Sequence, residues 1–136
     1  MKRLVLAFSA VLIALALPVA ANASNSTMHL TEKQTFGHLL DKGKKGESPG
    51  DIRTFGGTVF DAGKRVGHDQ IRCVVAGTCH AQVWVHGGSL IARRFVVTGP
   101  SFTAQITGGT GSYAGARGTV KVSSGAIAHY TVTLTT

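Results

Sequence analysis

Short runs of alternating apolar and polar residues, each ended by glycine, most constrain how this chain can fold. Glycine accounts for 18 of the 136 residues, which is too dense for helix interiors, and beyond the N-terminal stretch no sustained i, i+3, i+4 apolar spacing is present. Alternation of this kind gives a strand one apolar face. The pattern predicts strands at 28–36, 52–60, 69–75, 78–85, 89–97, 101–107, 118–123 and 128–134.

The connections between these runs are mostly of hairpin length, which favours antiparallel neighbours. Eight strands are enough to close a barrel with room for one small ligand. Closure also removes exposed strand edges, which matters in a chain rich in Val and Thr. We therefore predict an all-β protein that folds as an eight-stranded antiparallel closed barrel, with a β-sandwich as the alternative architecture.

The N-terminal stretch has the pattern of a secretory signal peptide. Lys2 and Arg3 precede an apolar run from residue 4 to 17, and Ala21-Asn22-Ala23 supplies an A-x-A cleavage signal. The run is shorter than the roughly 20 apolar residues of a spanning helix, although an uncleaved anchor is the alternative. We expect cleavage after Ala23, one barrel domain at residues 24–136, a secreted (extracellular or periplasmic) location and no stable membrane insertion.

Cleavage removes Lys2 and Arg3 and lowers the formal net charge from +8 to +6. A basic exported protein has nucleic acid, an anionic envelope or an acidic polymer as candidate partners. However, the cations are scattered along the chain, and no aromatic-interleaved basic stripe of the kind that holds single-stranded nucleic acid is present. The distribution favours solvated loop charge and no nucleic-acid partner.

The two cysteines, Cys73 and Cys79, suit an oxidising compartment. Five residues separate them, so they can face each other across a β-hairpin that pairs Ile71 with Ala81 and turns near Ala76-Gly77. A disulfide between Cys73 and Cys79 is the favoured interpretation. Two buried thiols, one of them functional, are the alternative.

Glu32 is the strongest candidate for chemistry on residue pattern alone. It shares a predicted strand face with Met28, Leu30 and Phe36, so its carboxylate is expected to point into the barrel. Apolar surroundings destabilise the charged form and raise the pKa towards the range useful in acid–base catalysis. A hydrated glutamate at the barrel mouth, paired with an arginine, is the alternative.

Residues 102–120, FTAQITGGTGSYAGARGTV, form a strand, a wide glycine turn and a return strand. This run resembles the signature hairpin of the allene oxide cyclase and dirigent barrel superfamily. Residues 50–55, 59–61, 64–67 and 130–134 resemble further parts of allene oxide cyclases in the same order. The resemblance covers most of residues 50–134 and implies a calycin-type barrel, assembled as a homotrimer, with an apolar cavity open at one end.

The resemblance also implies roles for individual residues. Glu32 would polarise the substrate, Cys73 would be the pocket cysteine unless it is bonded to Cys79, and Arg117 would line the pocket or pair with Glu32 or Asp69. Gly57 stands where allene oxide cyclases carry an asparagine, and no Ser-Pro pair closely follows Glu32. The residues expected to line the ligand cavity are Leu30, Phe36, Phe55, Gly57, Val59 and Phe95.

Two functions follow from these expectations. The first is a secreted barrel that binds a small hydrophobic molecule and guides its cyclisation or stereoselective coupling, mainly by holding one conformer. The alternative is a non-catalytic, lipocalin-like carrier or surface binding protein. We expect no cofactor and no metal site, because the six histidines form no H-x-H pair and no carboxylate cluster accompanies them. Trp84 and Tyr130 are expected in the core or at subunit contacts.

Overall fold

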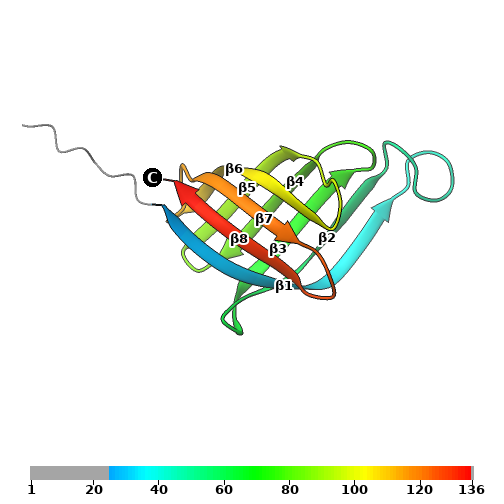
Figure 1. Cartoon of the computed structure of the whole chain (residues 1–136). Helices are drawn as coiled ribbons and strands as arrows, with labels where there is room; N and C mark the ends of the chain where they lie inside the picture. Colours follow the sequence, from blue (N-terminus) through cyan, green and yellow to red (C-terminus); the bar gives the residue numbers. More distant parts are fainter. Residues whose placement is uncertain (1–24, 136) are drawn as a thin grey trace, which may run out of the picture.

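Backbone hydrogen bonding in the computed structural model divides residues 25–135, the part of the chain that the structure describes, into strands and short connections (Figure 1). The expected cleavage site after Ala23 lies outside the described residues. Residues 25–135 contain no helix, and therefore none with the length and apolar character needed to span a membrane. The strands are β1 (Ser26–Leu40), β2 (Ile52–Asp61), β3 (Lys64–Val74), β4 (Cys79–Val85), β5 (Gly88–Phe95), β6 (Ser101–Gly111), β7 (Arg117–Ser123) and β8 (Ala128–Thr135).

Each strand pairs with its neighbours in the chain, and β1 also pairs with β8, so the sheet closes on itself. All the pairings are antiparallel. The predicted eight-stranded antiparallel closed barrel is confirmed, and the β-sandwich alternative is wrong. Closure leaves none of these eight strands with an unpaired edge, which is the expected advantage for strands rich in β-branched residues.

Alternate residues of each strand point into the barrel and form its core. One buried cluster consists of Leu30, Val59, Leu90, Ile106, Tyr130 and Val132. A second consists of Cys79, Ala92, Phe95 and Ala104. Tyr130 packs among aliphatic side chains of the first cluster, so its hydroxyl needs a polar partner inside the barrel.

Three strands are several residues longer than the sequence pattern predicts. β6 continues from Thr107 to Gly111, because residues 108–111 pair with residues 88–91 of β5. β1 continues from Phe36 to Leu40, because residues 36–40 pair with residues 52–56 of β2. The register shifts between Gln34 and Phe36, and this bulge ends the strict alternation on which the shorter prediction rests. β3 begins at Lys64 rather than Asp69, since residues 64–68 pair with the end of β2.

The β3–β4 hairpin confirms the predicted disulfide. Cys73 faces Cys79, and Ile71 faces Ala81, in the register expected from sequence. The two sulfur atoms are bonded, and the turn is made by residues that include Ala76, whose φ is 62°. The alternative of two free thiols is excluded, because neither cysteine is free.

The two ends of the barrel are built differently. Tight turns join β2 to β3, β4 to β5 and β6 to β7 at one end (Figure 1). The other end, which we call the loop rim, consists of four connections and the strand ends that flank them: β1–β2, β3–β4, β5–β6 and β7–β8.

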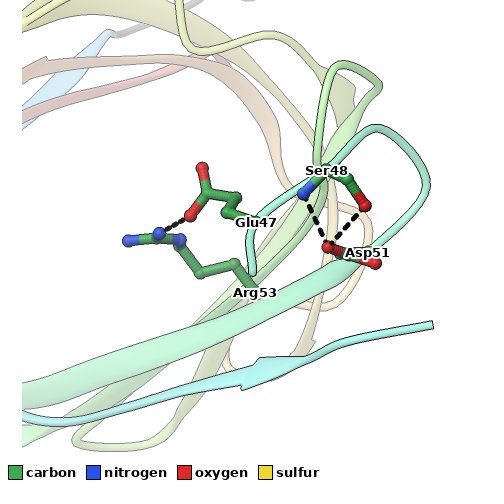
Figure 2. Close-up of polar contacts among 4 residues, drawn as sticks. All are labelled: Glu47, Ser48, Asp51 and Arg53. Atoms are coloured by element: carbon green, nitrogen blue, oxygen red, sulfur yellow. Dashed lines mark hydrogen bonds and ion pairs between the residues drawn. The ribbon is translucent and has the colours of Figure 1, made fainter. Parts of the chain in front are cut away.

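Asp51 organises the β1–β2 connection, which is the longest of the four. It accepts hydrogen bonds from the Ser48 amide at 2.7 Å and the Ser48 hydroxyl at 3.1 Å (Figure 2). The hydrogen bond from the Lys42 amide, together with the two bonds from Ser48, holds the pKa of Asp51 below its ordinary value.

Candidate active site

Glu32 lies inside the barrel, as the strand pattern predicts. It is opposite Val59 on β2 and only 7% exposed. The space for its carboxylate comes from Gly57, where an added Cβ would collide with a Glu32 carboxylate oxygen and with the backbone carbonyl of Lys33. Glycine at residue 57 is therefore a requirement of this arrangement.

Asp69 on β3 is a second carboxylate in the interior, and it is 1% exposed. One of its oxygens accepts a hydrogen bond of 2.7 Å from the amide of Gly57. The other accepts a hydrogen bond of 2.7 Å from the hydroxyl of Tyr130 on β8. Gly57 thus touches both acids, with its missing side chain making room for Glu32 and its N–H bound to Asp69.

Burial changes the proton affinity of all three groups. It raises the pKa of Glu32 from 4.5 to about 7, with a smaller contribution from the negative charge of Asp69. Burial also raises the pKa of Asp69, although the bonds from Tyr130 and Gly57 oppose the rise. The pKa of Tyr130 is raised by burial and by the nearby acids, so its phenol stays protonated. Glu32 is the group placed to exchange a proton near neutral pH.

Two small apolar cavities adjoin Asp69 and Tyr130, whereas Glu32 lines neither of them. Each has a volume of about 40 Å³, which is room for about one water-sized group. Tyr130 lines both, and Asp69 lines the one nearer the loop rim. The wall residues common to both cavities are Ala81, Val83, Ala92, Val120 and Tyr130.

Two of the six expected ligand-lining residues line the cavities, and Gly57 lines neither but makes room for the Glu32 carboxylate. Leu30 and Phe95 each line one of the cavities, and Val59 is fully buried in the core beside Leu30. Phe36 and Phe55 lie elsewhere. Phe55 is opposite Ile71 on the inner face of the sheet, but it lines a separate surface hollow formed by β1 and β2 rather than either cavity. Phe36 packs near His38, with ring centroids 5.8 Å apart. The bulge after Gln34 explains the position of Phe36, since it breaks the alternation that would have turned the ring inward.

Neither of the other two candidate catalytic residues joins Glu32. The sulfur of Cys73 is bonded to Cys79, so it offers no thiolate. Arg117 is exposed at the start of β7, and its guanidinium donates hydrogen bonds to the carbonyls of Thr107 at 2.6 Å and Ala116 at 2.8 Å. These contacts brace the glycine hairpin rather than reach the cavities.

Sequence reasoning missed Asp69 and Tyr130 as site residues. Asp69 lies two residues from Ile71 and four from Cys73, so strand alternation puts all three side chains on the inner face. That signal was available. Tyr130 is expected from sequence in the core or at a subunit contact, and its partnership with Asp69 depends on the closure of β8 against β1, which no local pattern reveals. Residues 25–135 show no cluster of three or more His, Cys, Asp or Glu side chains suited to a metal ion.

The closed eight-stranded antiparallel barrel is a fold of the cyclase and dirigent type. Solved structures of that type are similar in fold: the Diels Alderase AbmU from Streptomyces koyangensis (TM-score 0.64, 13% identity, 85% of this chain and 70% of the other covered) and the pterocarpan synthase dirigent protein GePTS1 (TM-score 0.54, 16% identity, 83% and 89% covered). A pyocyanin demethylase is also similar in sequence, at 30% identity over 80% of this chain and 99% of the other, with a TM-score of 0.71. The chain belongs to the family of this pyocyanin demethylase. No family model and no curated protein matches it.

Proposed function

We propose that this protein is an enzyme that binds a small, largely apolar ring compound inside the barrel and uses Glu32 to donate or accept a proton. The observation that carries the proposal is the buried pair of Glu32 and Asp69 around Gly57, in which Asp69 lines one of the two apolar cavities. A structural core gains nothing from two buried carboxyl groups, because each costs free energy to remove from water.

The division of labour follows from the hydrogen bonds. Asp69 is fixed by Tyr130 and the Gly57 amide, so it serves as a positioned charge. Burial, with a smaller contribution from that charge, brings the pKa of Glu32 to about 7, where a carboxyl group is present in both forms and is suited to general acid–base catalysis. Tyr130 lines both cavities and fixes the orientation of Asp69, which lines one of them.

The first substrate to test is pyocyanin, because a family member is named for its demethylation. The cavities are small, so a compound with several fused rings requires the side chains around them to move. The wall is suited to such a change, since Ala81, Ala92 and Ala104 present only methyl groups to the interior.

The test is to incubate the purified protein with pyocyanin and to search by mass spectrometry for a product lighter by one methylene unit. Glu32→Gln keeps the size of the side chain and removes the titrating proton, and we expect it to lower kcat by roughly 10²- to 10⁴-fold while ligand binding persists. Glu47→Gln, which changes an exposed carboxylate in the β1–β2 loop, is the matched control. Equal turnover by Glu32→Gln and the unaltered protein would remove the proposed role of Glu32.

A second candidate is guidance of cyclisation or stereoselective coupling of a hydrophobic molecule. It is favoured by the shared fold with a Diels Alderase and a dirigent protein, and it relies on confinement of one substrate conformer rather than on a proton. Product enantiomeric excess that is unchanged in Glu32→Gln would favour this candidate. Retention of an apolar molecule without conversion, detected by native mass spectrometry, would favour the carrier function instead.

A further inference from the structure

The large apolar side chains that residues 25–135 leave exposed gather at one end of the barrel. Leu40, Val96 and Ile127 are each more than half exposed, at 54%, 53% and 51%. All of them lie on the loop rim, and the tight turns at the opposite end carry none. The full set is Leu39, Leu40, Val74, Val96, Val97 and Ile127.

Backbone hydrogen bonds join the four connections of the rim in two pairs. The β1–β2 and β3–β4 connections are tied by the bonds Gly50 N–H to Val75 carbonyl (3.1 Å) and Val75 N–H to Asp51 carbonyl (2.8 Å). The β5–β6 and β7–β8 connections are tied by the Ser124 N–H to the Pro100 carbonyl at 2.7 Å. Val74, Val96 and Val97 share the lining of one surface hollow of about 590 Å³, which also spans the disulfide hairpin.

The same rim collects cations that are scattered in the sequence. The register places Arg72, His80 and Arg93 side by side on the exposed face of β3, β4 and β5. Arg94 joins them because the strand bulges between Arg93 and Phe95, and Arg94 takes a φ of 56°. Without the bulge, strict alternation would aim Arg94 into the barrel. The backbone therefore adopts a costly conformation that presents two adjacent guanidinium groups to solvent.

The acids of the rim do not neutralise this charge. Asp41, Glu47 and Asp51 all lie in the β1–β2 connection, where Asp41 accepts amides of its own loop and Glu47 pairs with Arg53 (Figure 2). From residue 70 to the end, the sequence contains no Asp or Glu. Those three acids face seven cations on the rim: Lys42, Lys44, Lys45, Arg53, Arg72, Arg93 and Arg94.

We propose that the loop rim docks this protein onto an anionic lipid surface, with Val96, Val97 and their apolar neighbours among the acyl chains and the arginines against the phosphate groups. Apolar tips beside a group of cations match both layers of such a surface. Contact with the rim of a second copy would bring like charges together. Binding to a water-soluble polyanion would leave the exposed valines and leucines in contact with water. The proposal is independent of the chemistry at Glu32.

Docking in this orientation also places the interior next to lipid. Phe95 and Phe102, whose rings stack with centroids 5.8 Å apart, line the cavity that lies directly inside the rim. The start of β1 lies at the opposite end, where Ser26 pairs with Leu134. An apolar molecule dissolved in lipid would reach Phe95 without crossing water.

The test is co-sedimentation of the purified protein with vesicles of phosphatidylcholine alone and of phosphatidylcholine with about one-third phosphatidylglycerol, at salt of about 0.05 M and 0.5 M. At low salt, we expect the protein to bind the anionic vesicles at least tenfold more tightly than the neutral ones. Arg72→Gln/Arg93→Gln should weaken binding by roughly twentyfold, since each cation near an anionic surface contributes about fivefold. Val96→Ser/Val97→Ser should weaken it by roughly tenfold. Lys64→Gln/Arg65→Gln, at the opposite end of the barrel, removes the same charge and should bind normally.

Equal binding to neutral and anionic vesicles, or no binding to either, would overturn the proposal. A loss of affinity in the Lys64/Arg65 variant as large as that in the Arg72/Arg93 variant would overturn it as well. Sedimentation equilibrium of the Val96/Val97 variant identifies the competing occupant. A fall in molecular mass with unchanged vesicle binding would assign the rim to a contact between copies of this chain. Each variant should give the circular dichroism spectrum of the unaltered protein, which shows that a loss of binding is not caused by unfolding.

Discussion

Tyr130 donates a hydrogen bond of 2.7 Å to Asp69 across the barrel interior, although 61 residues separate them in the sequence. The bond connects β8, the last strand, to β3, and it forms only when the sheet has closed. It fixes the orientation of the Asp69 carboxylate, whose other oxygen is held by the Gly57 amide. The Asp69 carboxylate therefore reaches its final orientation only when the barrel closes.

Tyr130→Phe should lower the free energy of unfolding by about 1.5–3 kcal/mol, because it removes a buried hydrogen bond to a carboxyl group. The loss should also raise the pKa of Asp69 further, since the bond from Tyr130 opposes the effect of burial. Urea denaturation gives the energy. Tyr113→Phe, on a half-buried tyrosine of the β6–β7 turn, is the matched control. An equal loss in both variants would show that the bond to Asp69 adds no stability.

The raised pKa of Glu32 predicts a pH dependence of stability. Below a pH of about 4.5 the group is protonated in both the folded and unfolded chain. Between about 4.5 and about 7 the folded protein keeps the proton while the unfolded chain has released it. The free energy of unfolding should therefore fall as the pH rises through this window, by up to roughly 3 kcal/mol, and then level off.

Glu32→Gln should remove this part of the pH dependence, because glutamine does not titrate. Asp69 contributes a fall of the same sign, so the informative quantity is the difference between the two proteins across the window. Thermal melting followed by circular dichroism at intervals of pH measures it. Parallel curves for the unaltered protein and Glu32→Gln would mean that Glu32 has an ordinary pKa in the folded state.

Strand alternation locates part of this site, and the reasons for its success and failure are physical. Alternation predicts that Glu32 faces inward because β1 alternates regularly up to Gln34, and the structure places it there. The prediction for Phe36 is wrong because the bulge after Gln34 depends on how β2 pairs with β1. Bulges of this kind are set by the partner strand, so the sequence of one strand alone does not reveal them.

Closure of the barrel is predictable from the number and spacing of strands, and the Cys73–Cys79 bridge from local register. The position of Arg117 is not. Its expected role comes from the glycine hairpin of a resembling superfamily, whereas here its guanidinium binds backbone carbonyls of the same hairpin. Likewise, the scattered cations have the pattern of solvated loop charge in the sequence, and only the fold places several of them on one rim.

Gly57→Ala should disrupt the acid pair directly. The new methyl group would collide with a Glu32 carboxylate oxygen and with the Lys33 carbonyl. The backbones of β1 and β2 cannot move apart to relieve this clash, because they are paired within the sheet. We expect a loss of about 3 kcal/mol or more in the free energy of unfolding. Gly99→Ala, where an added methyl group meets nothing within 4 Å, should change stability by less than about 1 kcal/mol. A stable Gly57→Ala protein with Glu32 in its present position would contradict the packing argument.

The disulfide between Cys73 and Cys79 should stabilise the protein modestly despite its short loop. The residues are six apart, and closing so small a loop in the unfolded chain gives about 2 kcal/mol on the chain-entropy model. Cys73→Ala/Cys79→Ala and chemical reduction should therefore lower the melting temperature by similar amounts, and the double variant should no longer respond to reductant. Intact mass after alkylation of the native protein should show no modified thiol. Modification of both cysteines without reduction would place them as free thiols, and it would reopen Cys73 as a reactive group beside Ile71 at the loop-rim end of the interior.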